Sequence, residues 1–403
     1  MNKNIRALFD DVMLPNYNPL PVILDRGLGS RVWDVDNNEY IDFAAGIAVT
    51  SLGHLHPELV HCLQEQSQKL WHLSNVLTNA PAVLCAQSLV DKTFADKVFF
   101  CNSGAEANEA ALKLARRYAI DTFSANKTKI IAFDNAFHGR TFFTVTAGGQ
   151  THYSERFGPK PGDIVHARYN DIESVIPLFS DETCAVIIEM LQGEGGVVPI
   201  EPEFLRQLKA LCVQYNALLI IDEVQTGVGR TGKLYAYQHY NVLPDILTTA
   251  KALGNGFPIG AMLTSNEVGQ VFTVGAHGST YGGNPLACTI ANKVLSLIDN
   301  ETLLDGVLSR SILFKEKLQE INARYKVFKE IRGQGLLLGM ELDTDKISES
   351  KALLRAALEC NVLCLVAGTK VMRFTPSLLI SESDILLGLE GFERAIHSTL
   401  VNN

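Results

Sequence analysis

The sequence has no long apolar run. No stretch approaches the roughly 18 consecutive apolar residues that a membrane-spanning helix needs, and the start, MNKNIRALFDDVMLPNY, mixes Asp and Arg where a secretory signal peptide has an apolar centre. Positive charge is also scarce, since 35 Lys and Arg face 44 Asp and Glu, for a net charge of -9. A nucleic acid or an anionic membrane would need clustered Lys and Arg. We therefore expect neither as a partner, and predict a cytoplasmic protein that acts on small molecules.

The eight cysteines are not spaced for metal binding. No two form a CxxC pair, and none has a histidine at the spacing of a zinc site. Their neighbours are mostly apolar, as in the stretch ALECNVLCLVAG that holds Cys360 and Cys364. Because free cysteine is among the most often buried residue types, we expect reduced, mostly buried thiols and no metal ion.

Apolar residues are plentiful, and their pattern indicates an α/β fold. Short β-rich runs at 97–101, 129–133, 184–190 and 217–222 alternate with segments of helical period at 104–120 and 201–215. This alternation is typical of βαβ units and a mostly parallel sheet covered on both faces. Ligands of such sheets bind at the carboxyl ends of the strands. The polar residues that follow these runs are therefore the candidates for chemistry.

The 403 residues exceed the usual size of a single core, so we expect a large domain and a smaller lobe. After about residue 300 the pattern predicts a long amphipathic helix over 303–325 and strands within 327–342. Two short strands around a DNN turn, within 31–43, are expected to join that lobe. The predicted division is 1–52 and 296–403 for the smaller domain, and 53–295 for the large one.

Asp222 ends the buried run ALLIID, where an unpaired carboxylate would cost free energy. A cationic group should therefore meet it. One interpretation is a helix cap or a local ion pair. The other is an aspartate that faces the protonated pyridine nitrogen of pyridoxal phosphate. The following GVGRTGK lacks the spacing of the phosphate-binding motif GxxxxGK[ST], which argues against an ATPase.

Two further segments carry candidate groups. Lys251, in PDILTTAKALGNGFPIGAM, has apolar or glycine neighbours that would lower the pKa of its amine and suit it to Schiff-base chemistry, although a lone lysine is usually just solvated. In CNSGAEANEA, Ser103 is a candidate helix N-cap with Glu106 in capping-box register. Ser103, Gly104 and Ala105 would also present a hydroxyl and N–H groups to a phosphate at the positive end of the helix dipole.

Together these segments resemble the class III, ornithine-type aminotransferases of the pyridoxal-phosphate fold type I superfamily. The similarity covers nearly the whole chain and includes the motifs LGHLHPELV, WHLSNVLTN, CNSGAEANEA, NAFHGRT, QGEGG, DEVQTGVGRTG, TTAKALGNGFPIGA, HGSTYGGNPLA, RGQGLLLGMEL and MRFTPSL. It implies a large domain built on a mostly parallel seven-stranded sheet, a smaller α+β domain from both termini, and pyridoxal 5′-phosphate as the cofactor.

The resemblance also implies the cofactor contacts. Lys251 would carry the cofactor and move protons, and Asp222 would face the pyridine nitrogen. The other contacts would come from Ser103, Gly104 and Ala105 at the phosphate, Phe137 and Val224 on the ring faces, Gln225 at the ring hydroxyl, Glu223 beside them, and Thr280 of a second subunit. A contact from a second subunit implies a homodimer with shared active sites.

The substrate groups follow from the same resemblance. Arg373 would bind the carboxylate of glutamate beside the reacting carbon. Glu194 would pair with Arg373 when a terminal-amine substrate lacks that carboxylate, because the guanidinium would otherwise stay desolvated and unpaired. Arg140 would bind the distal carboxylate, and Ser279 is a further candidate for substrate binding.

The expected reaction transfers the terminal amine of N2-acetyl-L-ornithine to 2-oxoglutarate, in arginine biosynthesis. Ornithine enzymes of the family use a Tyr in an AYSAV-like segment to engage the free α-amine, whereas this chain has Gly46 and Ile47 in AAGIAV. Succinylornithine and N-succinyl-diaminopimelate fit the same site. The alternatives are an ornithine or 4-aminobutyrate aminotransferase and a non-catalytic protein on the same fold. Met190, Leu191 and Asn255 depart from the usual family pattern beside the ring site, which bears on specificity rather than on the reaction.

Overall fold

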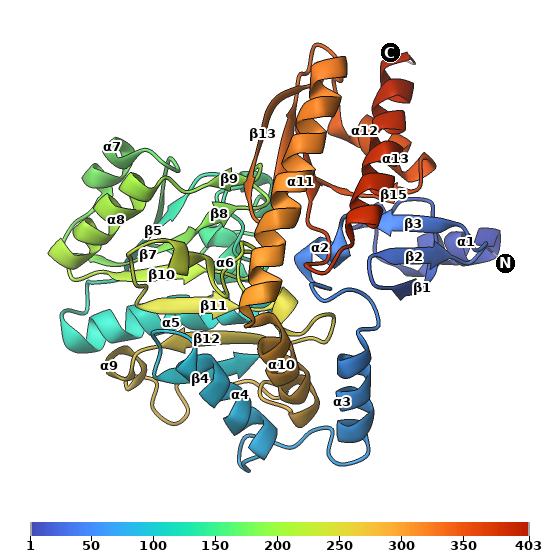
Figure 1. The fold of residues 1–403 in the computed structure, drawn as a ribbon. Helices are drawn as coiled ribbons and strands as arrows, with labels where there is room; N and C mark the ends of the chain where they lie inside the picture. The colour runs from blue at the N-terminus through green and yellow to red at the C-terminus, as the bar shows by residue number, and fades with distance from the viewer. Residues whose placement is uncertain (1, 402–403) are drawn as a thin grey trace.

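A seven-stranded sheet organises the larger part of the molecule (Figure 1). The computed structural model describes residues 2–401. The strands lie in the order β4 (Lys97–Cys101), β12 (Gly260–Thr264), β11 (Ile246–Thr249), β10 (Leu218–Asp222), β7 (Thr183–Glu189), β5 (Lys129–Phe133) and β6 (Ile164–Ala167). All neighbours pair in parallel except β12, which is antiparallel to β11 and β4. The predicted mostly parallel sheet is confirmed.

Both faces of this sheet are buried because successive strand residues point to opposite sides. One face packs against α5 (Gly104–Thr122) through a cluster that includes Ile130, Ile187 and Ile220. The other face belongs to a second cluster that includes Ile131, Ile188 and Ile221. Helices α4 (Ala80–Asp91), α8 (Pro202–Gln214) and α10 (Pro285–Ile298) contribute to that second cluster. Figure 1 shows α5 and α8 on opposite sides of the sheet.

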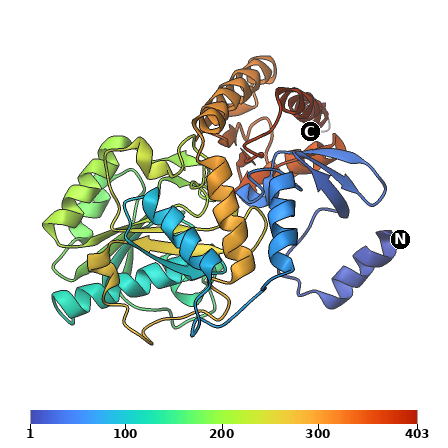
Figure 2. The ribbon, with the colours of Figure 1, turned by 60° about the horizontal axis from the view of Figure 1, so that its bottom comes forward.

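Shorter elements complete this part of the chain. Helix α10 packs on α4 and on α3 (Pro57–Ser67), as the view in Figure 2 shows. The others are α6 (Phe142–Ala147), α7 (Ile172–Val175), α9 (Asn266–Gly269) and the two-stranded pair β8 (Leu191–Gln192) and β9 (Val198–Pro199). Helix α1 (Asn2–Val12) lies beside the N-terminal strands in Figure 1, and α2 (Ala45–Ala48) precedes α3 in the chain.

A smaller lobe combines segments from both ends of the chain. One sheet joins β1 (Leu24–Leu28), β2 (Arg31–Asp34), β3 (Glu39–Asp42) and β15 (Val362–Leu363), with β3 and β15 parallel. A second joins β13 (Phe328–Gln334), β14 (Leu337–Leu342), β17 (Val371–Phe374) and β16 (Leu365–Ala367). Helices α11 (Glu301–Tyr325), α12 (Ser350–Glu359) and α13 (Glu382–Val401) pack around them (Figure 1). The long helix, the 327–342 strands and the 31–43 hairpin are present as predicted.

The division into 1–52, 53–295 and 296–403 stays a prediction. Residues 1, 402 and 403 of those ranges lie outside the described residues. One hydrophobic cluster runs from the sheet of the larger part into α11 and α13, so the core itself marks no boundary. The predicted boundary at 295/296 falls inside α10, which ends at Ile298. A boundary after Ile298 keeps that helix whole.

Three expectations about absent features concern residues 2–401. None of the described helices is long and apolar enough to span a membrane. All eight cysteines are free thiols, and all are buried except Cys360, which is half-buried. No cluster of three or more His, Cys, Asp and Glu side chains with the arrangement of a metal site occurs among the described residues.

Candidate active site

A cavity of about 390 Å³ lies at the carboxyl ends of the sheet strands. Asp222 and Glu189 end β10 and β7, and the segment 137–140 follows β5. This volume suits a small-molecule site. Ten of the residues predicted from sequence line the cavity, namely Ser103, Gly104, Ala105, Phe137, Arg140, Glu194, Asp222, Val224, Gln225 and Lys251.

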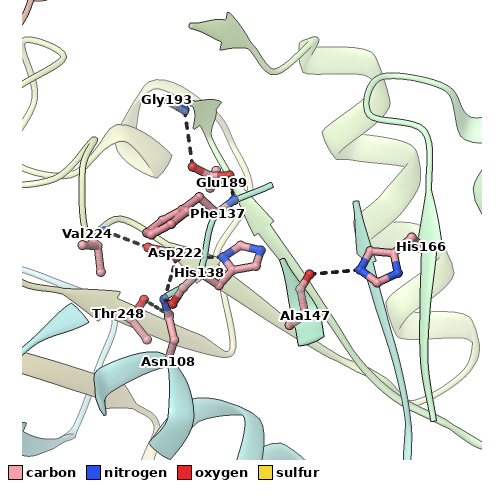
Figure 3. Close-up of polar contacts among 10 residues, drawn as sticks. All are labelled: Asn108, Phe137, His138, Ala147, His166, Glu189, Gly193, Asp222, Val224 and Thr248. Atoms are coloured by element: carbon pink, nitrogen blue, oxygen red, sulfur yellow. Dashed lines mark hydrogen bonds and ion pairs between the residues drawn. The ribbon is translucent and has the colours of Figure 1, made fainter. Parts of the chain in front are cut away.

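Asp222 lies in a network of buried polar groups (Figure 3). Its Oδ2 accepts a hydrogen bond from Asn108 Nδ2 at 2.7 Å and lies 2.8 Å from His138 Nδ1, while its Oδ1 accepts one from the Val224 N–H at 3.0 Å. Burial lowers the pKa of His138, but the hydrogen bond to Asp222 and the charge of Asp222 outweigh it, so the pKa is raised. Within this chain, His138 is therefore the titratable side chain that Asp222 contacts.

Lys251 occupies a strained position. It begins the short 3-10 helix Lys251–Leu253 directly after β11, with φ at 43°, a left-handed conformation that side-chain-bearing residues rarely adopt. Such strain is a common feature of functional sites. Burial lowers the pKa of its amine, with Glu194 opposing and Arg373 reinforcing the shift. More of the amine is therefore neutral than in an exposed lysine, which is the form that acts as a nucleophile or base.

The amino end of α5 forms one wall. Ser103 caps the helix by accepting from the Glu106 N–H, and the Glu106 carboxylate accepts from the Asn102 N–H and from Ser103 Oγ. The predicted capping is confirmed. The first-turn N–H groups of Gly104 and Ala105 have no helical acceptor and belong to residues that line the cavity. A Cβ on Gly104 would lie 2.6 Å from Val224 Cγ1, so only glycine fits beside that side chain.

Phe137 and Arg140 also line the cavity, and both contact Tyr153. The Phe137 ring meets the Tyr153 ring edge-on, with 5.9 Å between centroids. Arg140 is exposed, and its Cζ lies 3.6 Å from the centre of the Tyr153 ring. Stacking on an aromatic face restricts a guanidinium without using its hydrogen-bond donors. Arg140 is therefore positioned at the cavity wall with donors left for an anion.

Arg373, in β17, is buried with a single carboxylate partner. Its Nη1 donates to Glu194 Oε1 at 2.7 Å and to Gln225 Oε1 at 3.2 Å. Its Nε has no hydrogen-bond partner within residues 2–401. A buried donor without a partner is costly. The guanidinium therefore has capacity to bind a further acceptor, or to exchange Glu194 for one.

Four predicted residues are not among those that line this cavity: Arg373, which is paired with the lining residue Glu194, and Glu223, Ser279 and Thr280. The Glu223 carboxylate accepts from the Ala236 and Tyr237 N–H groups and from the Thr226 hydroxyl, so it holds a neighbouring loop, and its contact with the cofactor stays a prediction. Burial raises the pKa of Glu223 to about 7. Ser279 Oγ accepts from the Gly282 N–H and from Asn102 Nδ2, and Thr280 is exposed. Within one chain, Glu223, Ser279 and Thr280 therefore do not line the cavity with the other candidates.

The sequence prediction missed Asn108, His138 and Glu189, although all three line the cavity. His138 stands inside the quoted motif NAFHGRT, and Asn108 lies one turn after Gly104 on the same face of α5. Asn108 Oδ1 accepts from Thr248 Oγ1, which fixes the orientation of the amide toward Asp222. The signal available in the sequence was that Asn108 is a polar residue on the buried face of α5.

The departures from the family pattern have structural roles. Asn255 has a φ of 46°, which asparagine tolerates better than most residues. Its side chain accepts from the Leu52 N–H at 2.7 Å and donates to the Gly53 carbonyl at 3.2 Å, so it ties the Lys251 loop to the segment before α3. Met190 and Leu191 are buried in the hydrophobic clusters and contribute packing.

The chain is similar in sequence and in structure to known proteins. The family model "Aminotransferase class-III" matches residues 12–396. The acetylornithine aminotransferase of Vibrio parahaemolyticus is 58% identical over 98% of both chains. The acetylornithine/succinyldiaminopimelate aminotransferase of Yersinia pestis is 56% identical over 98% of both chains.

A solved structure of an ornithine aminotransferase from Toxoplasma gondii, described with partial occupancy of pyridoxal phosphate at its active site, superimposes with a TM-score of 0.95. It is 33% identical and covers 100% of this chain and 95% of its own.

Proposed function

This chain belongs to the class-III aminotransferase family, and from that premise we propose that it transfers the terminal amine of N2-acetyl-L-ornithine to 2-oxoglutarate. The products are N-acetyl-L-glutamate 5-semialdehyde and L-glutamate, which assigns the chain to arginine biosynthesis in the cytoplasm. The observation that carries the proposal is the Arg373–Glu194 pair. A buried guanidinium neutralised by a displaceable carboxylate suits a site that must accept one substrate with a carboxylate at the reacting carbon and one without.

Enzymes of this family depend on pyridoxal 5′-phosphate, and the residues of the cavity fit that cofactor. The amino end of α5, with Ser103, Gly104 and Ala105, suits a phosphate. Asp222 supplies a buried anion for the pyridine nitrogen, and Gln225 lies beside it for the ring hydroxyl. Phe137 and Val224, which line the cavity, would contact the faces of the ring. When bound, the cofactor supplies an electron sink that lets a proton leave the carbon bearing the amine.

Lys251 removes the proton from that carbon. Its amine is buried, with a lowered pKa, so it can accept a proton and return it as a positioned base and acid. The neighbouring charges of Glu194 and Asp222 keep the pKa from falling further. The hydrogen bonds from Asn108 and His138 hold the buried carboxylate of Asp222 in place.

Two arginines divide the recognition of the carboxylates. Arg373 binds the carboxylate of glutamate or 2-oxoglutarate after Glu194 moves away, and its partnerless Nε supplies an additional donor. Arg140, stacked on Tyr153, binds the distal carboxylate of either substrate. In the terminal-amine half-reaction Glu194 stays on Arg373 and neutralises it.

Replacement of Glu194 by Gln should separate the two half-reactions. The guanidinium of Arg373 then loses its counter-ion when no substrate carboxylate is present. For acetylornithine we expect kcat/KM to fall by an amount that corresponds to about one to a few kcal/mol of transition-state free energy. The kcat/KM for glutamate should stay equal or rise. Single-turnover kinetics on each half-reaction decides the question, and equal damage to both substrates would show that Glu194 does not discriminate between them.

The acylated α-amine is the finer part of the proposal. The relatives at 56% and 58% identity carry acetylornithine in their names, whereas the ornithine enzyme is 33% identical. The segment that enters the cavity at Val49 has Gly46 and Ile47 in left-handed conformation, and neither offers a hydroxyl to a free ammonium group. The name of the Yersinia relative makes N-succinyl-diaminopimelate a second candidate substrate.

A homodimer with shared sites is also proposed. Exposed apolar side chains surround Thr280, including Trp71 at 64%, Val76 at 91% and Tyr281 at 61% exposure. The segment of Trp71 and Val76 lies against that of Thr280, because Asn75 Nδ2 donates to the Ser279 and Gly282 carbonyls. Such a patch is typical of a protein–protein interface. A second copy on this surface would bring Thr280 to the phosphate end of its partner's cavity.

Mixed dimers test the contribution of Thr280. If Thr280 serves the other subunit, a Thr280→Ala chain combined with a Lys251→Ala chain has one intact site per heterodimer. We expect such heterodimers to show about half of the wild-type activity at limiting cofactor, whereas both homodimers are impaired. Subunit exchange with differently tagged chains, followed by purification of the heterodimer, gives the measurement. Heterodimers without recovered activity would place Thr280 in the site of its own chain.

A further inference from the structure

Glu189 is a second buried carboxylate beside Asp222. It ends β7 as Asp222 ends β10, and the two residues are register partners on these parallel strands. Both line the cavity. Asp222 is held by the side chains of His138 and Asn108, whereas Glu189 accepts from two backbone N–H groups, those of Phe137 at 3.1 Å and Gly193 at 3.4 Å (Figure 3). The roles assigned above leave Glu189 unused.

The two N–H groups come from the two loops that hold substrate groups. Glu189 Oε2 accepts from Phe137, whose loop carries Arg140 three residues later. Glu189 Oε1 accepts from Gly193, which directly precedes Glu194. One carboxylate therefore ties the loop of the distal-carboxylate arginine to the turn of the residue that neutralises Arg373.

Gly193 is confined from its other side as well. A Cβ at this position would lie 2.3 Å from Gln225 Oε1, the same oxygen that accepts from Arg373 Nη1. The peptide before Glu194 thus lies between the Glu189 carboxylate and the side chain of Gln225. Glu194 leaves Arg373 more easily if the turn at Gly193 gives way, and the Glu189 hydrogen bond opposes that movement.

We propose that Glu189 is a positioning residue that holds the Gly193–Glu194 turn with Glu194 on Arg373, and so sets the balance between the two substrates. This inference rests on the proposed function of the Arg373–Glu194 pair. Glu189 in its ionised form accepts from both N–H groups and favours the substrate without a carboxylate at the reacting carbon. Loss of this restraint favours glutamate, which displaces Glu194.

The electrostatic surroundings agree with this role. The pKa of Glu189 is raised to about 7, because burial and the charge of Asp222 together outweigh the lowering by His138 and the two backbone hydrogen bonds. Lys251 is a third charged group in the electrostatic environment of Glu189, and the Tyr169 hydroxyl donates to the Glu189 carbonyl oxygen at 2.8 Å. The restraint on Gly193 is therefore held by a group that changes charge near neutral pH. Glu189→Gln fixes that position in a neutral form of the same size, which accepts from only one of the two N–H groups.

A double-mutant cycle tests the proposal with the holoenzyme. The variants are Glu189→Gln, Glu194→Gln and their combination, with Asp34→Asn as the matched control, because Asp34 is a buried carboxylate that also accepts from backbone N–H groups but does not line the cavity. Single-turnover kinetics gives kcat/KM for glutamate and for acetylornithine. Calorimetry gives the Kd of glutarate, an unreactive dicarboxylate that must displace Glu194 from Arg373.

For Glu189→Gln we expect the ratio of kcat/KM for glutamate to that for acetylornithine to rise about tenfold, the scale of one hydrogen bond to a charged group. Glutarate should bind several-fold tighter. In the Glu194→Gln background the same change should leave the ratio within about twofold, because the residue through which Glu189 acts is gone. The control should keep the wild-type ratio. Glu189→Asp, which keeps the charge but shortens the reach, should shift the ratio in the same direction.

Equal damage to both half-reactions, an unchanged Kd of glutarate, or a shift in ratio that persists without Glu194 would overturn the role of Glu189. Failure of the wild-type enzyme to use acetylornithine would instead overturn the proposed substrate. The glutarate measurement still reports on the Gly193–Glu194 turn in that case, so the two failures are distinguishable.

Discussion

Lys251→Ala is expected to lower turnover by at least about 10⁴-fold while the fold stays intact, because the change removes the covalent anchor and the proton carrier together. The Lys251 side chain lines a cavity rather than filling the core, so its truncation removes few packing contacts. Single-turnover kinetics with glutamate measures the chemistry, and thermal unfolding followed by circular dichroism measures the fold. Near-normal transamination in this variant would contradict the mechanism.

Lys315→Ala is the matched control for this prediction. Lys315 is also partly buried, burial also lowers the pKa of its amine, and its Nζ donates to the Gly333 carbonyl far from the cavity. We expect this variant to lose some stability and to keep wild-type kinetics. The comparison separates the loss of a buried amine from the loss of this particular one.

Asp222→Asn is expected to lower kcat by about 10²- to 10⁴-fold, with cofactor still bound through the amino end of α5. The amide keeps the shape of the side chain but removes the anion that would face the pyridine nitrogen. It also leaves His138 without its counter-ion and turns an NH₂ group toward Asn108 or His138. Cofactor content, absorption spectra and both half-reactions give the measurement. Wild-type rates in both half-reactions would show that Asp222 has only a structural role.

The same variant has a predicted pH signature in stability. The pKa of His138 is raised above its ordinary value of 6.5 in the folded state. Its pair with Asp222 therefore contributes stability that is fully present below pH 6.5 and is lost as the pH rises through the folded pKa. Asp222→Asn should destabilise the protein most at low pH and less above that window. Melting temperatures across pH 5–9 give the comparison, with Asp245→Asn, at the opposite end of the sheet, as the control.

Most of the fold could be predicted from the sequence, and so could the positions of Asp222 and Lys251 in one cavity. The run before Asp222 is apolar on both alternating faces, as a strand covered on two sides requires. Parallel strands bring their carboxyl ends to one edge, so polar residues at those ends meet there whatever their separation in the chain. The N-cap at Ser103 is likewise a local pattern, and the structure confirms it.

What sequence did not reveal depends on long-range contacts and on side-chain direction. His138 and Asn108 reach Asp222 from distant parts of the chain, so no local pattern marks them as its partners. Glu223 stands next to Asp222 but points to the other side of the chain, toward the N–H groups of Ala236 and Tyr237. Successive residues leaving a strand end point in different directions, and only the packing around them decides which one enters the cavity.

The central claim is that the site accepts a terminal amine on a substrate whose α-amine is acylated. The most direct measurement is kcat/KM with 2-oxoglutarate for a panel of N2-acetyl-L-ornithine, N-succinyl-diaminopimelate, L-ornithine and 4-aminobutyrate. Because Gly46 and Ile47 offer no side-chain acceptor to a free α-ammonium group, burial of that charge is costly. The account predicts that acetylornithine exceeds ornithine and 4-aminobutyrate by at least about tenfold. A preference for ornithine or 4-aminobutyrate, or no reaction with any terminal amine, would contradict it.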